Sequence, residues 1–89
     1  MDRIQEIRTR LAHLSPLECQ IEDESALHAG HAGAASGAGH FRVKLISLQF
    51  EGLNRVSRHR LVYDAVGDLM HTEIHAFALV TLAPSECTA

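Results

Sequence analysis

Hydrophobic residues near the N-terminus recur every three or four positions and then switch to every second position. The first pattern predicts an amphipathic helix, which should end at Ser15-Pro16 because the residue before a proline disfavours helical geometry. The second pattern covers residues 17–23 and predicts a strand with one face exposed to water. The apolar positions are Ile4, Ile7, Leu11 and Leu14 in the helix and Leu17, Cys19 and Ile21 in the strand.

Three more elements follow a glycine-rich stretch. Residues 41–50 carry apolar side chains on both faces, which predicts a central strand with a bulge midway. Ser57 should cap a second helix. Residues 74–82 are apolar at nearly every position and predict a last strand, and Pro84 should end it and leave a short tail over 83–89. The buried stripe of the second helix is expected to contain Leu61, Val62, Ala65, Val66, Leu69 and Met70.

These elements have the order α-β-β-α-β. The strand–helix–strand unit predicts a right-handed parallel crossover, and the first two strands should pair antiparallel. The expected fold class is therefore α/β (α+β), with a three-stranded mixed sheet and the helices on one face. A chain of 89 residues is long enough for one domain, 1–89, with one modest core.

Composition narrows the class of protein. The sequence is 46% hydrophobic and 21% charged, which is typical of globular proteins. Its net charge of −3 provides no general attraction for nucleic acid, so DNA binding would need a local basic patch. No apolar run is long enough for a membrane span. Cys19 and Cys87 are far apart and form no Cys-x-x-Cys pair, which favours a reducing compartment, and we expect a cytoplasmic protein.

The glycine-rich stretch LHAGHAGAASGAGHF, residues 27–41, contains three histidines. Its glycines disfavour both helix and strand, and the connection over 26–40 is longer than most, so we predict a flexible and functional loop. The His-x-x-His spacing of His28 and His31 leaves a zinc site as one alternative. A solvated linker with inert histidines is the other. The third histidine is His40.

The segment RVSRHR contains the one concentrated basic patch, formed by Arg55, Arg58, His59 and Arg60. Cations at a helix N-terminus oppose the helix dipole, so a negatively charged partner surface, a glutathione carboxylate or a phosphate should compensate. A solvated helix start is the alternative. The sequence shows no Ser/His/Asp arrangement, paired carboxylates or phosphate loop, and we therefore expect no enzyme.

Six stretches resemble the BolA family over nearly the whole chain, in the same order and with matching gaps. BolA-like proteins have a fold similar to the class II KH domain, in agreement with the order of elements above. The resemblance implies two functions. One is partnership with a monothiol glutaredoxin, with or without a shared [2Fe-2S] cluster, and the other is transcriptional regulation by direct DNA binding. The stretches are ECQIEDES, HAGHAG, GHFRVKLISLQFEG, RHRLVYDAVGDLM, IHAFAL and TLAPSE.

In the cluster role, the resemblance implies His75 as one ligand and a residue of the loop between the first two strands as the second. That residue would be His28 or His31, and His40 matches a further family histidine. We expect the first two before His40, because His40 adjoins a rigid strand. A core histidine is the alternative for His75.

A [2Fe-2S] cluster needs four protein ligands, and this chain offers only two imidazoles. We therefore expect the glutaredoxin, with its glutathione, to supply two sulfur ligands, and we expect the chain alone to be a monomer without the cluster. The net charge of −3 favours this adaptor over the DNA-binding regulator, because a protein with several phosphate contacts should have a basic face.

Overall fold

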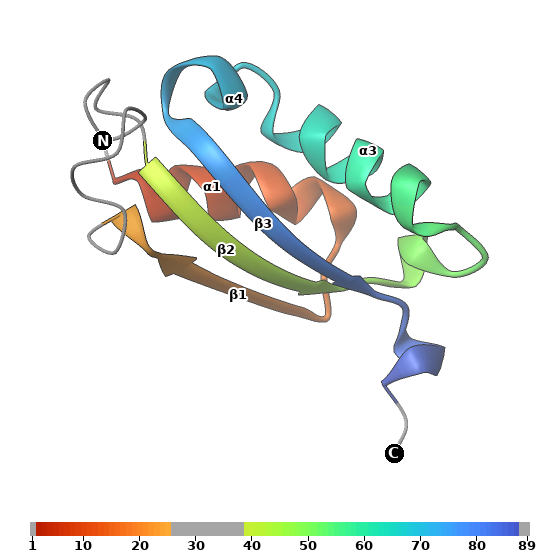
Figure 1. The fold of residues 1–89 in the computed structure, drawn as a ribbon. Coiled ribbons are helices and arrows are strands. Elements are labelled where there is room, and N and C mark those ends of the chain that lie inside the picture. The colour runs from red at the N-terminus through yellow and green to blue at the C-terminus, as the bar shows by residue number, and fades with distance from the viewer. Residues whose placement is uncertain (1, 26–38, 88–89) are drawn as a thin grey trace.

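The computed structural model describes residues 2–25 and 39–87, and within these the predicted order of elements is confirmed (Figure 1). The second predicted helix is divided in two. The elements are α1 (Arg3–Leu11), β1 (Glu18–Asp23), β2 (Gly39–Ile46), α3 (Arg55–Val66), α4 (Leu69–Thr72) and β3 (Ile74–Leu82).

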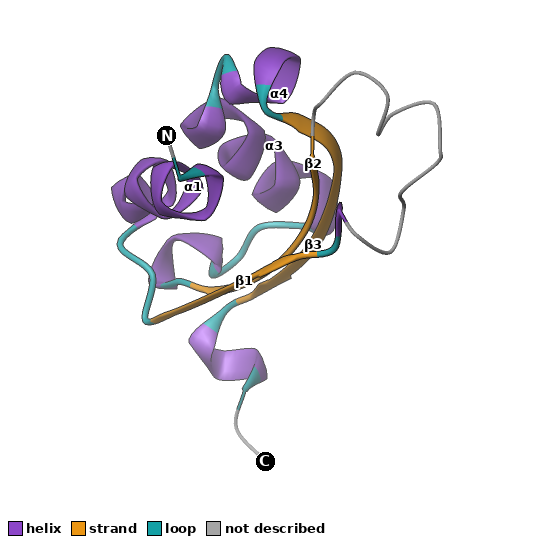
Figure 2. Cartoon of the chain, turned by 90° about the vertical axis from the view of Figure 1, so that its left-hand side faces the viewer, coloured by secondary structure: helices purple, strands orange, loops and turns teal. Residues whose placement is uncertain are grey.

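The three strands form one mixed sheet in the order β1-β2-β3, so β2 is the central strand as predicted. β1 pairs antiparallel with β2, and β2 pairs parallel with β3. Figure 2 shows α1, α3 and α4 together on one face of this sheet. The α/β class and the one-sided arrangement of the helices are therefore confirmed.

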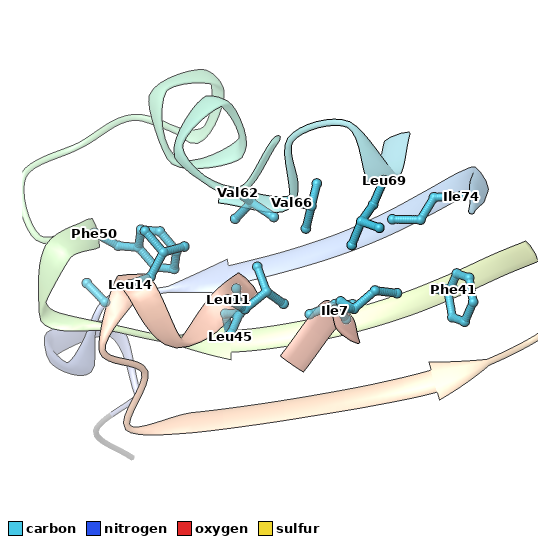
Figure 3. Packing of buried hydrophobic residues seen from close by; sticks show 12 residues of the cluster. Ile7, Leu11, Leu14, Phe41, Leu45, Phe50, Val62, Val66, Leu69 and Ile74 are labelled. Atoms are coloured by element: carbon cyan, nitrogen blue, oxygen red, sulfur yellow. The ribbon is translucent and has the colours of Figure 1, made fainter. Parts of the chain in front are cut away.

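The core lies between that helical layer and the sheet (Figure 3). Alternate residues of β2 point into it, since Phe41, Val43 and Leu45 are all buried while Arg42 between them is exposed. This period of two explains why the strand pattern was visible in the sequence. The buried partners from the helical side are Ile7, Leu11, Leu14, Val62, Val66 and Leu69.

The strand predicted over 41–50 ends earlier, at Ile46. The cause is Ser47, which is fully buried: its hydroxyl donates to the carbonyl of Leu14 at 2.6 Å and accepts from the N–H of Gln49 at 3.1 Å. The chain turns there into a short 3₁₀ helix, which still brings Phe50 into the core. The predicted bulge in the middle of β2 is also wrong, because the register shifts at its first residues instead.

The second helix begins before the predicted cap and stops before the predicted end. Asn54 is the N-cap, and its side-chain oxygen accepts from the N–H of Ser57 at 2.8 Å. At the other end the chain leaves the helix at Gly67, whose φ of +56° lies in the left-handed region that suits glycine. Leu69 is therefore buried from α4 rather than from a continuous helix.

The predicted loop over 26–40 is too long at its C-terminal end, because Gly39 and His40 belong to β2. Two hydrogen bonds hold them there: the N–H of Gly39 donates to the carbonyl of Glu73 at 2.9 Å, and the N–H of His40 donates to the hydroxyl of Ser25 at 3.0 Å. The predicted flexibility of residues 26–38 lies outside the described residues.

Candidate metal centre

Two histidines that are 35 positions apart in the sequence lie side by side at one end of the sheet. His40 is the second residue of β2, and His75 is the second residue of the neighbouring strand β3. Their ring centroids are 5.1 Å apart, with the ring planes inclined at 48°. His40 is buried and His75 is exposed, so one ring is fixed by its surroundings and the other faces solvent.

A β-bulge makes this arrangement possible. Gly39 pairs with Ile74, and the next residue, His40, already pairs with Ala76, so His75 is an extra residue on β3. A bulge changes the direction of the side chain that it carries, and such irregularities are common beside functional sites. Here Ile74 is buried in the core, while the residue after it faces outward.

Gly39 is required by its contacts rather than by its backbone angles. A Cβ atom at this position would lie 2.6 Å from Cε2 and 2.8 Å from Cζ of the Phe41 ring. Phe41 is itself buried in the core, so its ring has little room to move away. The glycine therefore lets β2 begin directly above this ring, one residue before His40.

The separation of the two rings fits ligands of a single metal ion. With metal–nitrogen bonds of about 2.0–2.1 Å, two imidazoles on one tetrahedral ion have centroids roughly 5 Å apart. Within residues 2–25 and 39–87, no group of three or more His, Cys, Asp or Glu side chains is placed to hold a metal. A metal held by this pair would therefore need its remaining ligands from donors outside the described residues.

The other predicted ligands, His28 and His31, lie outside the described residues, as does the zinc alternative that rested on their spacing. The preference for them over His40 therefore stays a prediction. The reason given for that preference was that His40 adjoins a rigid strand, and the structure does not support this reason. A position in a rigid strand does not keep this residue away from His75, because the parallel register places the two rings next to each other.

At the opposite end of β3, the basic patch is divided into engaged and exposed residues. Arg58 donates to the carbonyls of Leu53 (2.9 Å) and Thr81 (3.1 Å) and to Oε1 of Glu86 (2.6 Å). Its side chain is only 11% exposed, so it joins α3 to β3 and to the C-terminal turn. The same carboxylate oxygen accepts from the N–H of Ala83 at 2.7 Å. These contacts give Arg58 a structural role that its place in a basic run does not reveal.

The remaining cations of the patch face solvent or a groove. Arg55 and Arg60 are exposed, and neither side chain makes a hydrogen bond or ion pair with another described residue. His59 is half-buried, and burial together with the positive charge of Arg55 lowers the pKa of its imidazole. This end of α3 is therefore electropositive, with Arg55 and Arg60 as the side chains available to an anionic partner.

Glu86 is a partner of the basic patch that the sequence did not reveal. The hydrogen bond from Arg58, with help from the Ala83 N–H, lowers the pKa of the Glu86 carboxyl group. Arg58 and Glu86 are 28 positions apart, and no spacing rule connects a helix start with a residue beyond the last strand.

A model of the BolA-like protein family matches residues 11–86, which include β1, β2, β3, α3 and α4 but only the last residue of α1. The chain belongs to the BolA-like family. This confirms the resemblance found in the sequence. None of the helices in the described residues is long and apolar enough to cross a membrane.

Three curated relatives show which proteins this chain is similar to. The chain is 44% identical over 89 residues to the chloroplastic protein BOLA1 of Arabidopsis thaliana, covering 96% of this chain and 56% of that protein. It is 40% identical over 86 residues to the chloroplastic/mitochondrial SufE-like protein 1 of the same plant, covering 90% and 23%. It is 36% identical over 75 residues to the DNA-binding transcriptional regulator BolA of Escherichia coli, covering 84% and 69%.

The chain thus spans about half or less of the two plant relatives. Among solved structures, BolA1 from Arabidopsis thaliana superposes with a TM-score of 0.84 at 42% identity, covering 99% of this chain and 98% of that one. This agreement confirms the BolA-like fold.

Proposed function

We propose that this chain is an adaptor that binds a monothiol glutaredoxin and shares a [2Fe-2S] cluster with it, in iron–sulfur cluster trafficking or iron homeostasis. The pair formed by His40 and His75 carries the proposal, because two imidazoles 5.1 Å apart fit one metal ion. His75 is one ligand, and the second is His40 or one of the two histidines at 28 and 31. The SufE-like relative supports a role in iron–sulfur metabolism.

The chemistry of the donor set favours a shared cluster over one held by this chain alone. A [2Fe-2S] cluster takes four ligands, usually thiolates. Cys19 is on β1 and Cys87 is beyond the C-terminal 3₁₀ turn, and neither joins the histidine pair. Two sulfur ligands from the glutaredoxin and its glutathione would complete the set. Imidazole ligation should raise the reduction potential of the cluster above that of an all-thiolate cluster.

The proposal describes an adaptor and not an enzyme, acting in the cytoplasm. A reducing compartment suits the two cysteines, which are both free thiols. Ligation requires neutral imidazole, so cluster binding should weaken as the pH falls through about 6.5.

The direct test is co-purification of the chain with a monothiol glutaredoxin and glutathione under anaerobic conditions. A shared cluster should give a heterodimer whose visible absorption and circular dichroism differ from those of the cluster bound by the glutaredoxin alone. A spectrum identical to that of the glutaredoxin alone, with this chain eluting separately, would contradict the proposal.

A DNA-binding regulator is the second candidate, supported by the name of the Escherichia coli relative. With Arg58 engaged inside the protein, the contacts to phosphate would come mainly from Arg55 and Arg60. Each phosphate contact contributes roughly 0.9 to the slope of log affinity against log salt. Replacing both arginines by alanine should therefore lower the slope by about 1.8. An unchanged slope would exclude this surface from DNA binding.

A further inference from the structure

Among the described residues β3 pairs only with β2, which makes it an edge strand of the sheet. The N–H of Ser47 donates to the carbonyl of Leu82 at 3.1 Å, so this carbonyl faces β2. In a parallel pair, alternate residues direct their N–H and C=O groups to the same side. Val80 therefore also faces β2, whereas Leu79 and Thr81 present their backbone groups to the outside.

The contact made by Arg58 supports this assignment. Its guanidinium group comes from α3, outside the sheet, and reaches the carbonyl of Thr81 at 3.1 Å. Apart from this contact, no other hydrogen bond joins the outward-facing backbone groups of Leu79 or Thr81 to another described residue. Thr81 is buried and its carbonyl is occupied by Arg58, so the open part of this edge is at Leu79, which is half-buried. A strand edge with open backbone groups is a template for one more strand.

A groove of about 460 Å³ runs along this edge. One wall is the C-terminal half of β3, where four consecutive residues, 79–82, line it, as expected for a groove that follows the strand. The other wall is the start of α3 and the turn before it. Figure 1 shows α3 beside β3, with its first turn near the C-terminal end of the strand. The residues of this second wall are Leu53, Asn54, Arg55, Arg58 and His59, and Glu86 lies at the end of the groove.

The charges at the mouth of the groove favour an anionic ligand. Arg58 and Glu86 form an ion pair at 2.6 Å, so their charges largely offset each other. Arg55 is exposed, has no ion-pair partner among the described residues and lies near the half-buried ring of His59. Leu53 and Leu79 add apolar surface between the two walls.

We propose that this groove binds an extended peptide segment of a partner protein by β-strand addition, with a carboxylate of the peptide against Arg55. The open backbone groups of the edge, centred on Leu79, supply the hydrogen bonds, and the groove selects the side chains. From His75 to Leu82 the strand advances roughly 23 Å, so the peptide would bind far from the histidine pair. The inference therefore stands independently of cluster binding and gives the chain a second attachment point.

The test uses an acetylated hexapeptide of alternating threonine and valine that ends in aspartate, added to the ¹⁵N-labelled chain. A second peptide has the same sequence with N-methyl groups on alternate amides, which removes the donors along one edge. The shift changes should map to residues 77–81 and the start of α3. The N-methylated peptide should bind at least about tenfold more weakly, since several backbone hydrogen bonds are lost together.

Two protein variants test the charge. Arg55→Ala should weaken binding of the hexapeptide roughly fivefold, because it removes a charge-assisted contact. Arg60→Ala is the matched control: it removes an exposed arginine from the same helix that does not line the groove, and it should leave the affinity unchanged.

Three results would overturn the proposal. The first is equal affinity for the two peptides. The second is binding of an eight-nucleotide oligo-dT at residues 77–81 under conditions where the hexapeptide does not bind. The third is a shift of the same residues with protein concentration alone, which would assign the edge to a second copy of the chain.

Discussion

Histidine and arginine side chains that are equally conspicuous in the sequence lie at the two ends of β3, and the fold uses them in different ways. At the N-terminal end, a bulge turns His75 outward, and its ring lies 5.1 Å from that of His40. At the C-terminal end, Arg58 is drawn inward and holds three neighbouring segments together. Runs of similar residues therefore do not share one role, and local backbone geometry decides which side chain meets a partner.

The largest effect on stability is expected at the inward-facing arginine. Arg58→Ala removes three hydrogen bonds from a side chain that is 11% exposed, and should lower the free energy of unfolding by about 2–3 kcal/mol. Arg60→Ala, two residues later and exposed, should change it by less than about 0.5 kcal/mol. Urea unfolding followed by circular dichroism measures both. Equal effects of the two substitutions would contradict the contrast between engaged and exposed arginines.

A smaller loss is expected at the histidine end. Gly39→Ala places a Cβ within 2.6 Å of the Phe41 ring, and should destabilise the fold by about 1–2 kcal/mol. Because Gly39 precedes His40, the same change should alter the ring contact with His75, visible as a shift of both imidazole signals in NMR spectra. Gly52→Ala is a control at a glycine of φ +75° with no heavy atom within 4 Å of the new Cβ, and should leave the imidazole signals in place.

The smallest expected effect is on the loss of folding stability at acidic pH. The pKa of Glu86 is lower in the folded chain than its ordinary value, so its ionised form contributes stability at neutral pH, and this contribution is lost as the pH falls through the folded pKa. Glu86→Gln should remove that part of the acid dependence, whereas Glu22→Gln, on an exposed residue of β1, should not. Unfolding midpoints measured between pH 7 and pH 3 compare the two. If the unfolding midpoints of Glu86→Gln and of the unmodified chain fell in parallel with pH, ionised Glu86 would not contribute to stability.

The alternation of apolar and polar residues was sufficient to predict β1, and the nearly continuous apolar run was sufficient to predict β3. Such patterns were not sufficient for the end of β2. That end depends on the hydroxyl of Ser47 meeting the carbonyl of Leu14, 33 positions away, and a contact of this range leaves no local pattern. The helix start was misplaced for a related reason: Asn54 and Ser57 are both favoured cap residues, and the sequence does not rank them.

The candidate site was only partly visible in the sequence. His75 was found through the family resemblance, and the family model confirms the family but not the role of this residue. The closeness of His40 to it depends on the strand register and on a bulge that begins at Gly39. Neither the register nor the bulge changes the hydrophobic pattern of the sequence, so neither could be predicted without the three-dimensional structure.

The central claim is that His75 and a second histidine of this chain ligate the shared cluster. Pulsed electron paramagnetic resonance on the reduced complex, with only this chain's histidines labelled with ¹⁵N, tests it most directly. We predict strong coupling to two imidazole nitrogens. The number of strongly coupled nitrogens should fall to one in His75→Ala. It should stay at two in the control His71→Ala, which changes an exposed histidine of α4. His40→Ala then decides whether His40 is the second ligand. Coupling that is absent, or unchanged by His75→Ala, would contradict the claim.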